Sequence, residues 1–211
     1  MKKIEANQIL QKSGKKIFST SDLRNLFGVE NTNTLNKQIR GLISANVITR
    51  ISKGYYYLSS NKPSDFELAN VLYRPSYVSL DSALNYYGIL VQTPQEITSV
   101  TTKLAMVIED GGKRFSYSHL DPKYFSDYQK SERFLIATPE KALVDAMFFV
   151  ALGRGSLSIE ELNLGAINKD KVNELASKIS NRAFKKYFAS IKLSNYDFQR
   201  PNTRIFQTTR D

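Results

Sequence analysis

The sequence predicts an α+β protein with two domains, a small one at residues 1–62 and a larger mixed one at residues 63–211. Two patterns support this prediction. Three short segments with apolar residues at helical spacing precede a β-rich pair, and beyond residue 62 helical and β-rich segments alternate without a repeat. The chain has 211 residues, 41% of them hydrophobic, and is long enough to bury a core in each domain.

Two short helices are expected at the start of the chain. The first ends near Gly14, because glycine readily takes the left-handed conformation of a helix end. Its apolar residues are Ile4, Ile9 and Leu10. The second begins at the capping candidates Ser19 and Thr20 and ends at Gly28. Its apolar residues are Leu23, Leu26 and Phe27.

A third helix and a hairpin complete the first domain. The helix is predicted from about residue 33 to residue 45, with apolar side chains spaced to form one buried stripe. The stripe consists of Leu35, Ile39, Leu42 and Ile43. The β-rich segments VITRIS and YYYL follow, and Lys53 and Gly54 between them indicate a hairpin turn. Three short helices followed by a hairpin is the element order of a winged helix-turn-helix.

The second domain is predicted to mix helices and strands. Residues 61–64 (NKPS) form the expected linker. Helices are expected at residues 65–73, 81–87, 138–152, 171–179 and 182–191, with capping boxes at Ser64/Glu67 and Ser158/Glu161. Strands are expected at residues 77–79, 96–102 and 133–137, and a hairpin at residues 104–120. From about residue 195 the chain is a polar tail without clear periodicity, carrying Arg200, Arg204 and Arg210.

The positive charge of the chain is concentrated in the first domain. Residues 1–62 hold 11 basic and 3 acidic residues, a net charge of +8, whereas residues 63–211 hold 19 basic and 17 acidic residues, a net charge of +2. A local basic field attracts a polyanion and speeds its encounter with the protein. This asymmetry indicates nucleic acid as the partner of the first domain, although a merely solubilising basic surface would give the same count.

The composition excludes several kinds of site. The chain has no cysteine, so disulfide frameworks, cysteine-ligated zinc and thiol nucleophiles are excluded. His119 is the only histidine, which excludes a histidine-rich metal site. No apolar run reaches the length of a membrane span or of a secretory signal. We therefore expect a cytoplasmic protein without a membrane partner.

The third predicted helix has the residue types of a recognition helix. A helix that enters the major groove of DNA must offer hydrogen-bonding side chains on one face while its other face packs on the domain. Asn36 and Gln38 are types that pair with adenine, and Lys37 or Arg40 can reach guanine or a phosphate. The helix N-terminus is expected to offer free backbone N–H groups to phosphates, together with the side chains of Thr32, Asn33 and Thr34.

Two further segments are predicted to touch the DNA backbone. The hairpin places Lys53 at its tip, with Arg50 and Tyr55 beside it, where they can contact a phosphate or the minor groove. The start of the second helix can clamp the backbone with three hydroxyl side chains, Ser19, Thr20 and Ser21. Each of these residues could equally be a solvated surface residue, and only their coincidence with the basic charge favours DNA binding.

Catalytic motifs are absent from the sequence. A metal-dependent nuclease of the PD-(D/E)xK kind needs two acids and a lysine at set spacing, but Glu140 directly precedes Lys141 and Asp110 lies three residues before Lys113. No phosphate-loop, dinucleotide-binding or HExxH motif occurs. We expect no enzyme, catalytic residue, cofactor or metal ion. A DNA-targeted nuclease and a protein-interaction module stay open as alternatives.

The second domain carries motifs of a known family. The stretches YRPSYVSLDSALNYYGIL, TPQEITSVTT and ATPEKALVDAMFF, together with FSTSDLRNLFGV and ISKGYYYL near the N-terminus, resemble the AbiEi family of transcriptional regulators, the antitoxins of AbiE-type abortive-infection systems. The resemblance covers roughly residues 1–165. The C-terminal helices and tail match only loosely.

The resemblance implies a function for each domain. The first would repress transcription of its own operon at inverted repeats in double-stranded DNA. The second would act as the antitoxin against a cognate nucleotidyltransferase-like toxin, with or without a stable complex. By position, the DNA-facing residues would be those of the third helix and the hairpin, whereas the family pattern identifies no individual antitoxin residue in the second domain.

Overall fold

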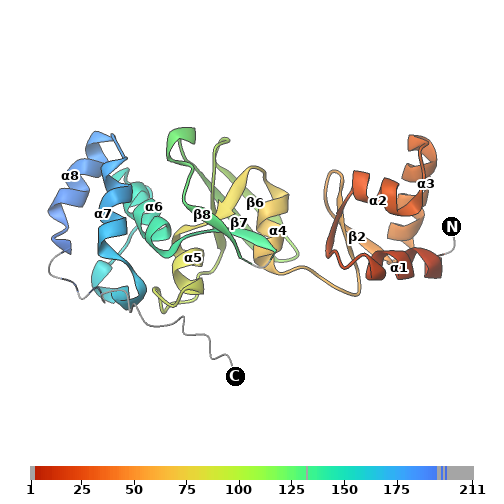
Figure 1. Cartoon of the computed structure of the whole chain (residues 1–211), viewed down its shortest axis with the longest axis horizontal. Helices are drawn as coiled ribbons and strands as arrows, with labels where there is room; N and C mark the ends of the chain where they lie inside the picture. The colour runs from red at the N-terminus through yellow and green to blue at the C-terminus, as the bar shows by residue number, and fades with distance from the viewer. Residues whose placement is uncertain (1–2, 132, 194–195, 197, 199–211) are drawn as a thin grey trace, which may run out of the picture. The chain divides into compact units, whose positions relative to one another are not determined.

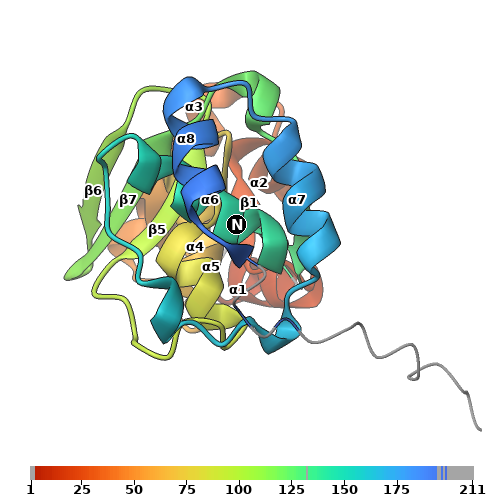
Figure 2. The ribbon, with the colours of Figure 1, turned by 90° about the vertical axis from the view of Figure 1, so that its left-hand side faces the viewer.

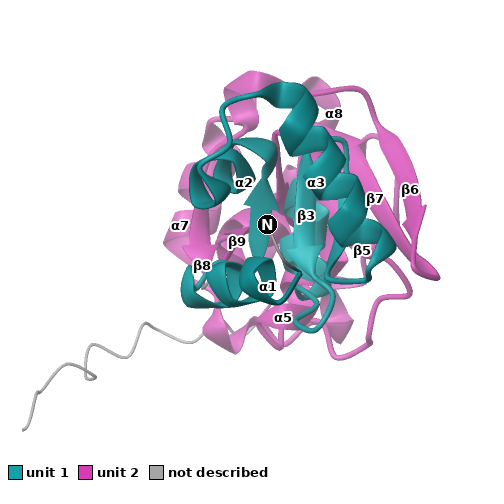
Figure 3. Cartoon of the chain, turned by 90° about the vertical axis from the view of Figure 1, so that its right-hand side faces the viewer, with its two compact units in different colours: residues 1–72 teal, residues 73–211 magenta. Residues whose placement is uncertain are grey.

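The computed structural model describes residues 3–131, 133–193, 196 and 198 and has the predicted mixed α+β class, with helices and two sheets (Figure 1). The chain divides into two compact units, Met1–Leu72 and Tyr73–Asp211, which Figure 3 shows in separate colours. The sequence placed the domain boundary near residue 62, before α4 (Asp65–Leu72); α4 contacts β2 (Ile48–Ser52) and groups with the first unit.

The first unit has four helices and a three-stranded sheet within its described residues. The elements before α4 are α1 (Lys3–Lys12), β1 (Ile17–Ser19), α2 (Thr20–Phe27), α3 (Thr32–Ser44), β2 and β3 (Tyr55–Leu58). The strands lie in the order β1-β3-β2 and are antiparallel. The predicted three helices and hairpin are therefore present, at bounds within one or two residues of those expected. The strand β1 was not predicted.

Each of the three predicted helices contributes buried residues to the core of the first unit, but not every apolar residue of these helices is buried. Leu10, Leu23, Leu35 and Phe18 are fully buried. Ile43, which was predicted to belong to the buried stripe, is 37% exposed, and the apolar Ile4 of the first helix is 74% exposed. Small Ala6 packs inward on α1 in place of Ile4, and Ile43 lies one helical position beyond the stripe that the core covers.

The second unit is built on a six-stranded mixed sheet. Its strands are β4 (Ser76–Val78), β5 (Ile97–Thr101), β6 (Met106–Asp110), β7 (Lys113–His119), β8 (Tyr128–Ser131) and β9 (Phe134–Ala137). They lie in the order β6-β7-β5-β4-β9-β8, in which β4 and β9 are parallel and so are β5 and β7. The sequence predicted all of them except the edge strand β8.

Helices pack against the sheet and against one another. The α-helices of the second unit are α5 (Leu80–Tyr86), α6 (Pro139–Ala151), α7 (Lys169–Ser177) and α8 (Arg182–Ser190). α5 packs on β5 and on α6, and α7 and α8 both pack on α6 (Figure 2). As a result α6 is buried on all sides from residue 140 to residue 149, which explains why its sequence is apolar nearly all round.

A buried polar network joins β4 to α6. The carboxylate of Asp145 accepts hydrogen bonds from Ser79 Oγ at 2.8 Å and from Tyr77 OH at 3.0 Å, and it forms an ion pair with Lys141 one helical turn earlier. The Lys141 and Asp145 side chains are 4% and 1% exposed. Burial, together with the charge of Asp145, raises the pKa of Tyr77, which therefore stays protonated as a donor.

The C-terminal predictions have a mixed outcome. α7 and α8 confirm the predicted helices, but the capping box expected at Ser158 and Glu161 is wrong. Ser158 instead donates to Glu160 at 3.2 Å and precedes only a short 3-10 helix, Ile159–Glu161. A second 3-10 helix spans Leu164–Ala166, and another, Pro122–Tyr124, follows β7.

The three tail arginines lie outside the described residues. Within the described part, no helix is long and apolar enough to cross a membrane.

Candidate nucleic-acid interface

The turn between α2 and α3 is held by side-chain hydrogen bonds. α2 ends at Gly28, whose φ of 61° places it in the left-handed region that glycine tolerates. The Arg24 guanidinium donates to the carbonyl oxygen of Glu30 and to Thr32 Oγ1, the latter at 3.2 Å. Arg24 thus fixes the start of α3 relative to α2, a role that the sequence analysis did not assign to it.

α3 separates a buried face from a polar face. Leu35, Ile39 and Leu42 are at most 5% exposed and pack in the core of the unit. At 100° per residue, the opposite face is centred on residues 33, 37, 40 and 44. Those positions are Asn33, Lys37, Arg40 and Ser44, and all four are exposed. The helix therefore presents an amide, two cations and a hydroxyl along one outward line.

The remaining predicted residues of α3 lie on its flanks. Thr34 and Asn36 are exposed on either side of the outward line. Gln38 is only partly exposed, and its Oε1 atom is buried without a hydrogen-bond partner among the described residues. Arg40 Nε donates to the Asn36 carbonyl at 3.3 Å. The sequence predicted the same role, pairing with adenine, for Asn36 and Gln38, whereas Gln38 is the less accessible of the two.

The N-terminus of α3 does not offer the free backbone N–H groups that the sequence analysis expected. Asn31 caps the helix, and its Oδ1 atom accepts from Asn33 N at 2.9 Å and from Thr34 N at 3.1 Å. Leu35 N donates to the Asn31 carbonyl at 3.0 Å. A phosphate at this position would have to displace the cap, because a capping side chain satisfies the same donors that an anion would use.

The start of α2 is also capped internally. Ser19 and Asp22 form a reciprocal capping box: Asp22 N donates to Ser19 Oγ at 3.1 Å, and Ser19 N donates to Asp22 Oδ2 at 2.8 Å. Asp22 is also paired with Lys15 at 2.5 Å. Partial burial opposes its charge, but the hydrogen bonds from Lys15 and Ser19 prevail and lower the pKa of Asp22. Of the three predicted clamp residues, Ser21 alone is exposed.

We therefore expect Ser19→Ala to reduce stability and Ser21→Ala to reduce only DNA binding. Loss of an N-cap hydroxyl costs about 1 kcal/mol. Urea unfolding of the Ser19→Ala protein measures that cost, and Ser19→Thr, which keeps the capping hydroxyl, should recover most of it. If Ser19→Ala left stability unchanged but weakened DNA binding, the hydroxyl would be a DNA contact rather than a cap.

The hairpin turn is tied to the start of α2. Thr20 donates to the Gly54 carbonyl from its backbone N at 2.9 Å and from Oγ1 at 3.3 Å. Gly54 has a φ of 84°, in the left-handed region, so a residue with a side chain would be strained at this turn. Lys53 is exposed at this turn. The Thr20 hydroxyl is thus engaged within the unit, and it positions the lysine.

The other predicted hairpin residues lie on the strands beside the turn. Arg50 is exposed, and its Nε donates to the Ser52 carbonyl at 3.2 Å, where the register of β2 and β3 shifts. Tyr55 is half-buried and pairs with Ser19 of β1 and Ser52 of β2. The hairpin therefore adds two exposed cations, Lys53 and Arg50, to those of α3.

Two features of this surface were not predicted from the sequence. Ser44, one turn beyond Arg40, lies on the outward line of α3, and helical spacing from Lys37 could have identified it. Arg24 could not have been found from spacing, because its acceptors follow α2 in the turn. Among the described residues no group of three or more histidine, cysteine or acidic side chains is placed to hold a metal ion. The chain matches no protein-family model and no curated protein.

Proposed function

We propose that the first unit is a winged helix-turn-helix that binds double-stranded DNA, and that the protein is a sequence-specific repressor of its own operon. The observation that carries this proposal is the outward face of α3, where Asn33, Lys37 and Arg40 lie opposite the buried stripe. Asparagine, lysine and arginine are residue types that read base edges or bind phosphates in the major groove.

The dimensions and charge of the unit support the same function. α3 has 13 residues and is about 20 Å long at 1.5 Å per residue. An α-helix with its side chains is about 10–12 Å across, which matches the width of a major groove, about 12 Å. The hairpin that follows carries exposed Arg50 and Lys53 for an adjacent phosphate or the minor groove. The net charge of +8 over residues 1–62 supplies the attraction that the phosphate backbone requires.

We propose further that the second unit provides antitoxin activity against a nucleotidyltransferase-like toxin. The support is the resemblance of its motifs to AbiEi-type antitoxins. Within these motifs, Tyr77 and Ser79 of the first stretch and Lys141 and Asp145 of the third form the buried network of β4 and α6. These motif residues therefore have a structural role in the core of the second unit. Contacts with a toxin would have to come from the exposed residues around them.

An electrophoretic shift assay on the DNA upstream of the protein's own gene tests the repressor function. We expect binding that is at least about 1,000-fold tighter than to a scrambled duplex of the same length, because specific and non-specific affinities of such proteins differ by that factor or more. Both duplexes should be measured at two salt concentrations, since phosphate contacts make affinity fall with salt. Equal affinity for the two duplexes would exclude sequence-specific repression.

A further inference from the structure

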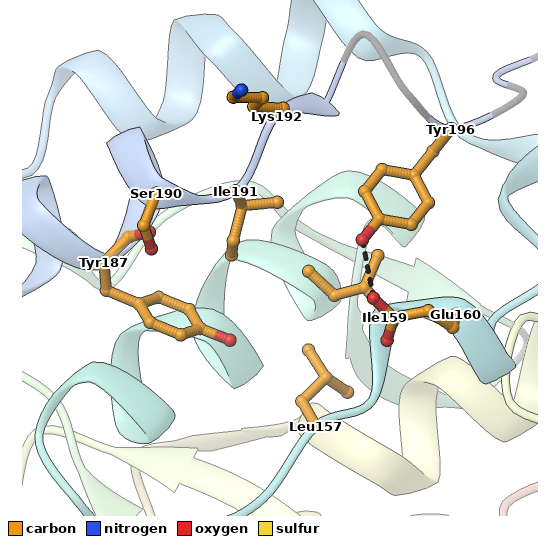
Figure 4. A pocket seen from close by; sticks show the side chains of 8 residues that line it. All are labelled: Leu157, Ile159, Glu160, Tyr187, Ser190, Ile191, Lys192 and Tyr196. Atoms are coloured by element: carbon orange, nitrogen blue, oxygen red, sulfur yellow. Dashed lines mark hydrogen bonds between the residues drawn. The ribbon is translucent and has the colours of Figure 1, made fainter.

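A cavity of about 320 Å³ lies between α8 and the 3-10 helix Ile159–Glu161 in the second unit (Figure 4). Its size is at the lower end of the range of small-ligand sites. A second cavity of about 270 Å³ adjoins it and shares Ile159, Glu160 and Tyr196 as lining residues. Neither cavity belongs to the DNA-binding surface proposed above, because both lie in the other unit.

The polar lining of the cavity includes the exposed carboxylate of Glu160. Tyr196 OH donates to Glu160 Oε1 at 2.8 Å, and Ser158 Oγ donates to Oε2 at 3.2 Å. The Glu160 backbone N–H and the Tyr196 hydroxyl hold the pKa of Glu160 below its usual value. The carboxylate is therefore ionised at neutral pH. Each of its oxygens has two lone pairs and can accept a further hydrogen bond from a ligand.

Aromatic and aliphatic side chains complete the lining. In Figure 4 the Tyr187 ring, on α8, points into the cavity, and Leu157, Ile159 and Ile191 line it beside the ring. The Tyr187 hydroxyl has no hydrogen-bond partner within the described part of the chain. Lys192 also lines the cavity, but its ammonium extends away from Glu160 in Figure 4. One ionised, solvent-exposed carboxylate thus borders a space that two tyrosine rings and an aliphatic wall also line.

We propose that this cavity binds a guanidinium group, either of a free arginine-like molecule or of an arginine side chain in a peptide. A planar guanidinium can donate two parallel hydrogen bonds to a carboxylate and stack on a tyrosine ring at the same time. Its aliphatic stem matches the wall formed by Leu157 and Ile191. An ammonium ion would satisfy the charge of Glu160 but not the planar geometry, so the site should prefer arginine to lysine.

Calorimetric titration of the full-length protein with N-acetyl-arginine amide tests this proposal. We expect saturable binding of the arginine amide. N-acetyl-citrulline amide, which has the same shape without the charge, should bind at least about tenfold more weakly than the arginine amide. Glu160→Gln should weaken arginine-amide binding by about tenfold or more. Tyr187→Leu should also weaken it, whereas Tyr187→Phe, which keeps the ring, should retain it. An arginine-containing tripeptide that binds more tightly than the free amide would identify a peptide as the source.

Glu174→Gln is the matched control. Glu174 is an exposed glutamate of α7 that pairs with Lys178 and does not line the cavity, so its loss removes the same charge without changing the site. Three outcomes would each overturn the proposal. The Glu160→Gln and Glu174→Gln proteins could bind the arginine amide equally well, or the unaltered protein could bind the citrulline amide as tightly as the arginine amide. The third is that the unaltered protein shows no saturable binding. None of these outcomes depends on whether the first unit binds DNA.

Discussion

Asp145→Ala is expected to destabilise the second unit by about 3–5 kcal/mol, because it leaves the Lys141 ammonium buried without its partner. The Lys141 side chain is 4% exposed, so water cannot replace the lost carboxylate. Ser79 and Tyr77 would lose the acceptor of their hydroxyl groups at the same time. Urea unfolding followed by circular dichroism, with hydrogen exchange of the α6 amides, measures the loss.

Two control variants distinguish the effect of the buried charge on stability from the effect of alanine on helix propensity. Glu174→Ala breaks an ion pair of the same i, i+4 spacing on α7, but there both side chains are more than half exposed, and stability should hardly change. The double variant Lys141→Met/Asp145→Leu removes both charges and should recover the part of the loss that the unpaired Lys141 ammonium causes, whereas Tyr77 and Ser79 still lack their acceptor. A single variant Asp145→Ala as stable as the natural chain would show that the network contributes nothing to the fold.

The double variant Lys37→Ala/Arg40→Ala is expected to weaken specific DNA binding by about 100-fold or more. Each good base contact contributes roughly 1–3 kcal/mol of discrimination, and both side chains lie on the outward line of α3. Loss of each phosphate contact would also make the plot of log affinity against log salt less steep, by about one unit of slope. Both residues are exposed, so the fold should be unaffected. Titration of the upstream duplex at several salt concentrations measures both quantities.

Lys185→Ala provides the control for charge alone. Lys185 is an exposed lysine of α8 in the second unit, and replacing it removes a positive charge far from α3 in sequence. We expect its affinity to stay close to that of the natural chain. If Lys185→Ala weakened binding as much as Lys37→Ala/Arg40→Ala does, net charge rather than the α3 face would account for the attraction to DNA, and the assignment of α3 as a recognition helix would fail.

Local signals predicted the helices of the first unit well. α2 (Thr20–Phe27) is capped by Ser19 and Gly28 as expected, because a capping box and a left-handed glycine act within a few residues. The spacing of Leu35, Ile39 and Leu42 identified the buried face of α3, and with it the opposite face that the proposed function uses. The same reasoning failed for Ile43, because the width of a buried stripe depends on what packs against it.

The sequence predicted the residue types of the candidate interface, but not which of their hydrogen-bonding groups are available to DNA. The hydroxyls of Ser19 and Thr20 and the amides at the start of α3 were expected to meet phosphates, and all of them have partners inside the unit. Sequence spacing shows which side chains share a face. It does not show which donors another part of the chain already uses, as Gly54 does for Thr20 across 34 residues.

The sequence by itself determined the α+β class, the α-helices, the two hairpins and the location of the positive charge, because each of these depends mainly on neighbours within about one helical turn or one tight turn. Only the tertiary structure decided the rest. The short strands β1 and β8 exist because β3 and β9 supply their hydrogen bonds. The network of Tyr77, Ser79 and Asp145 joins residues more than 60 positions apart. Such contacts form only when the chain has folded, so no local pattern encodes them.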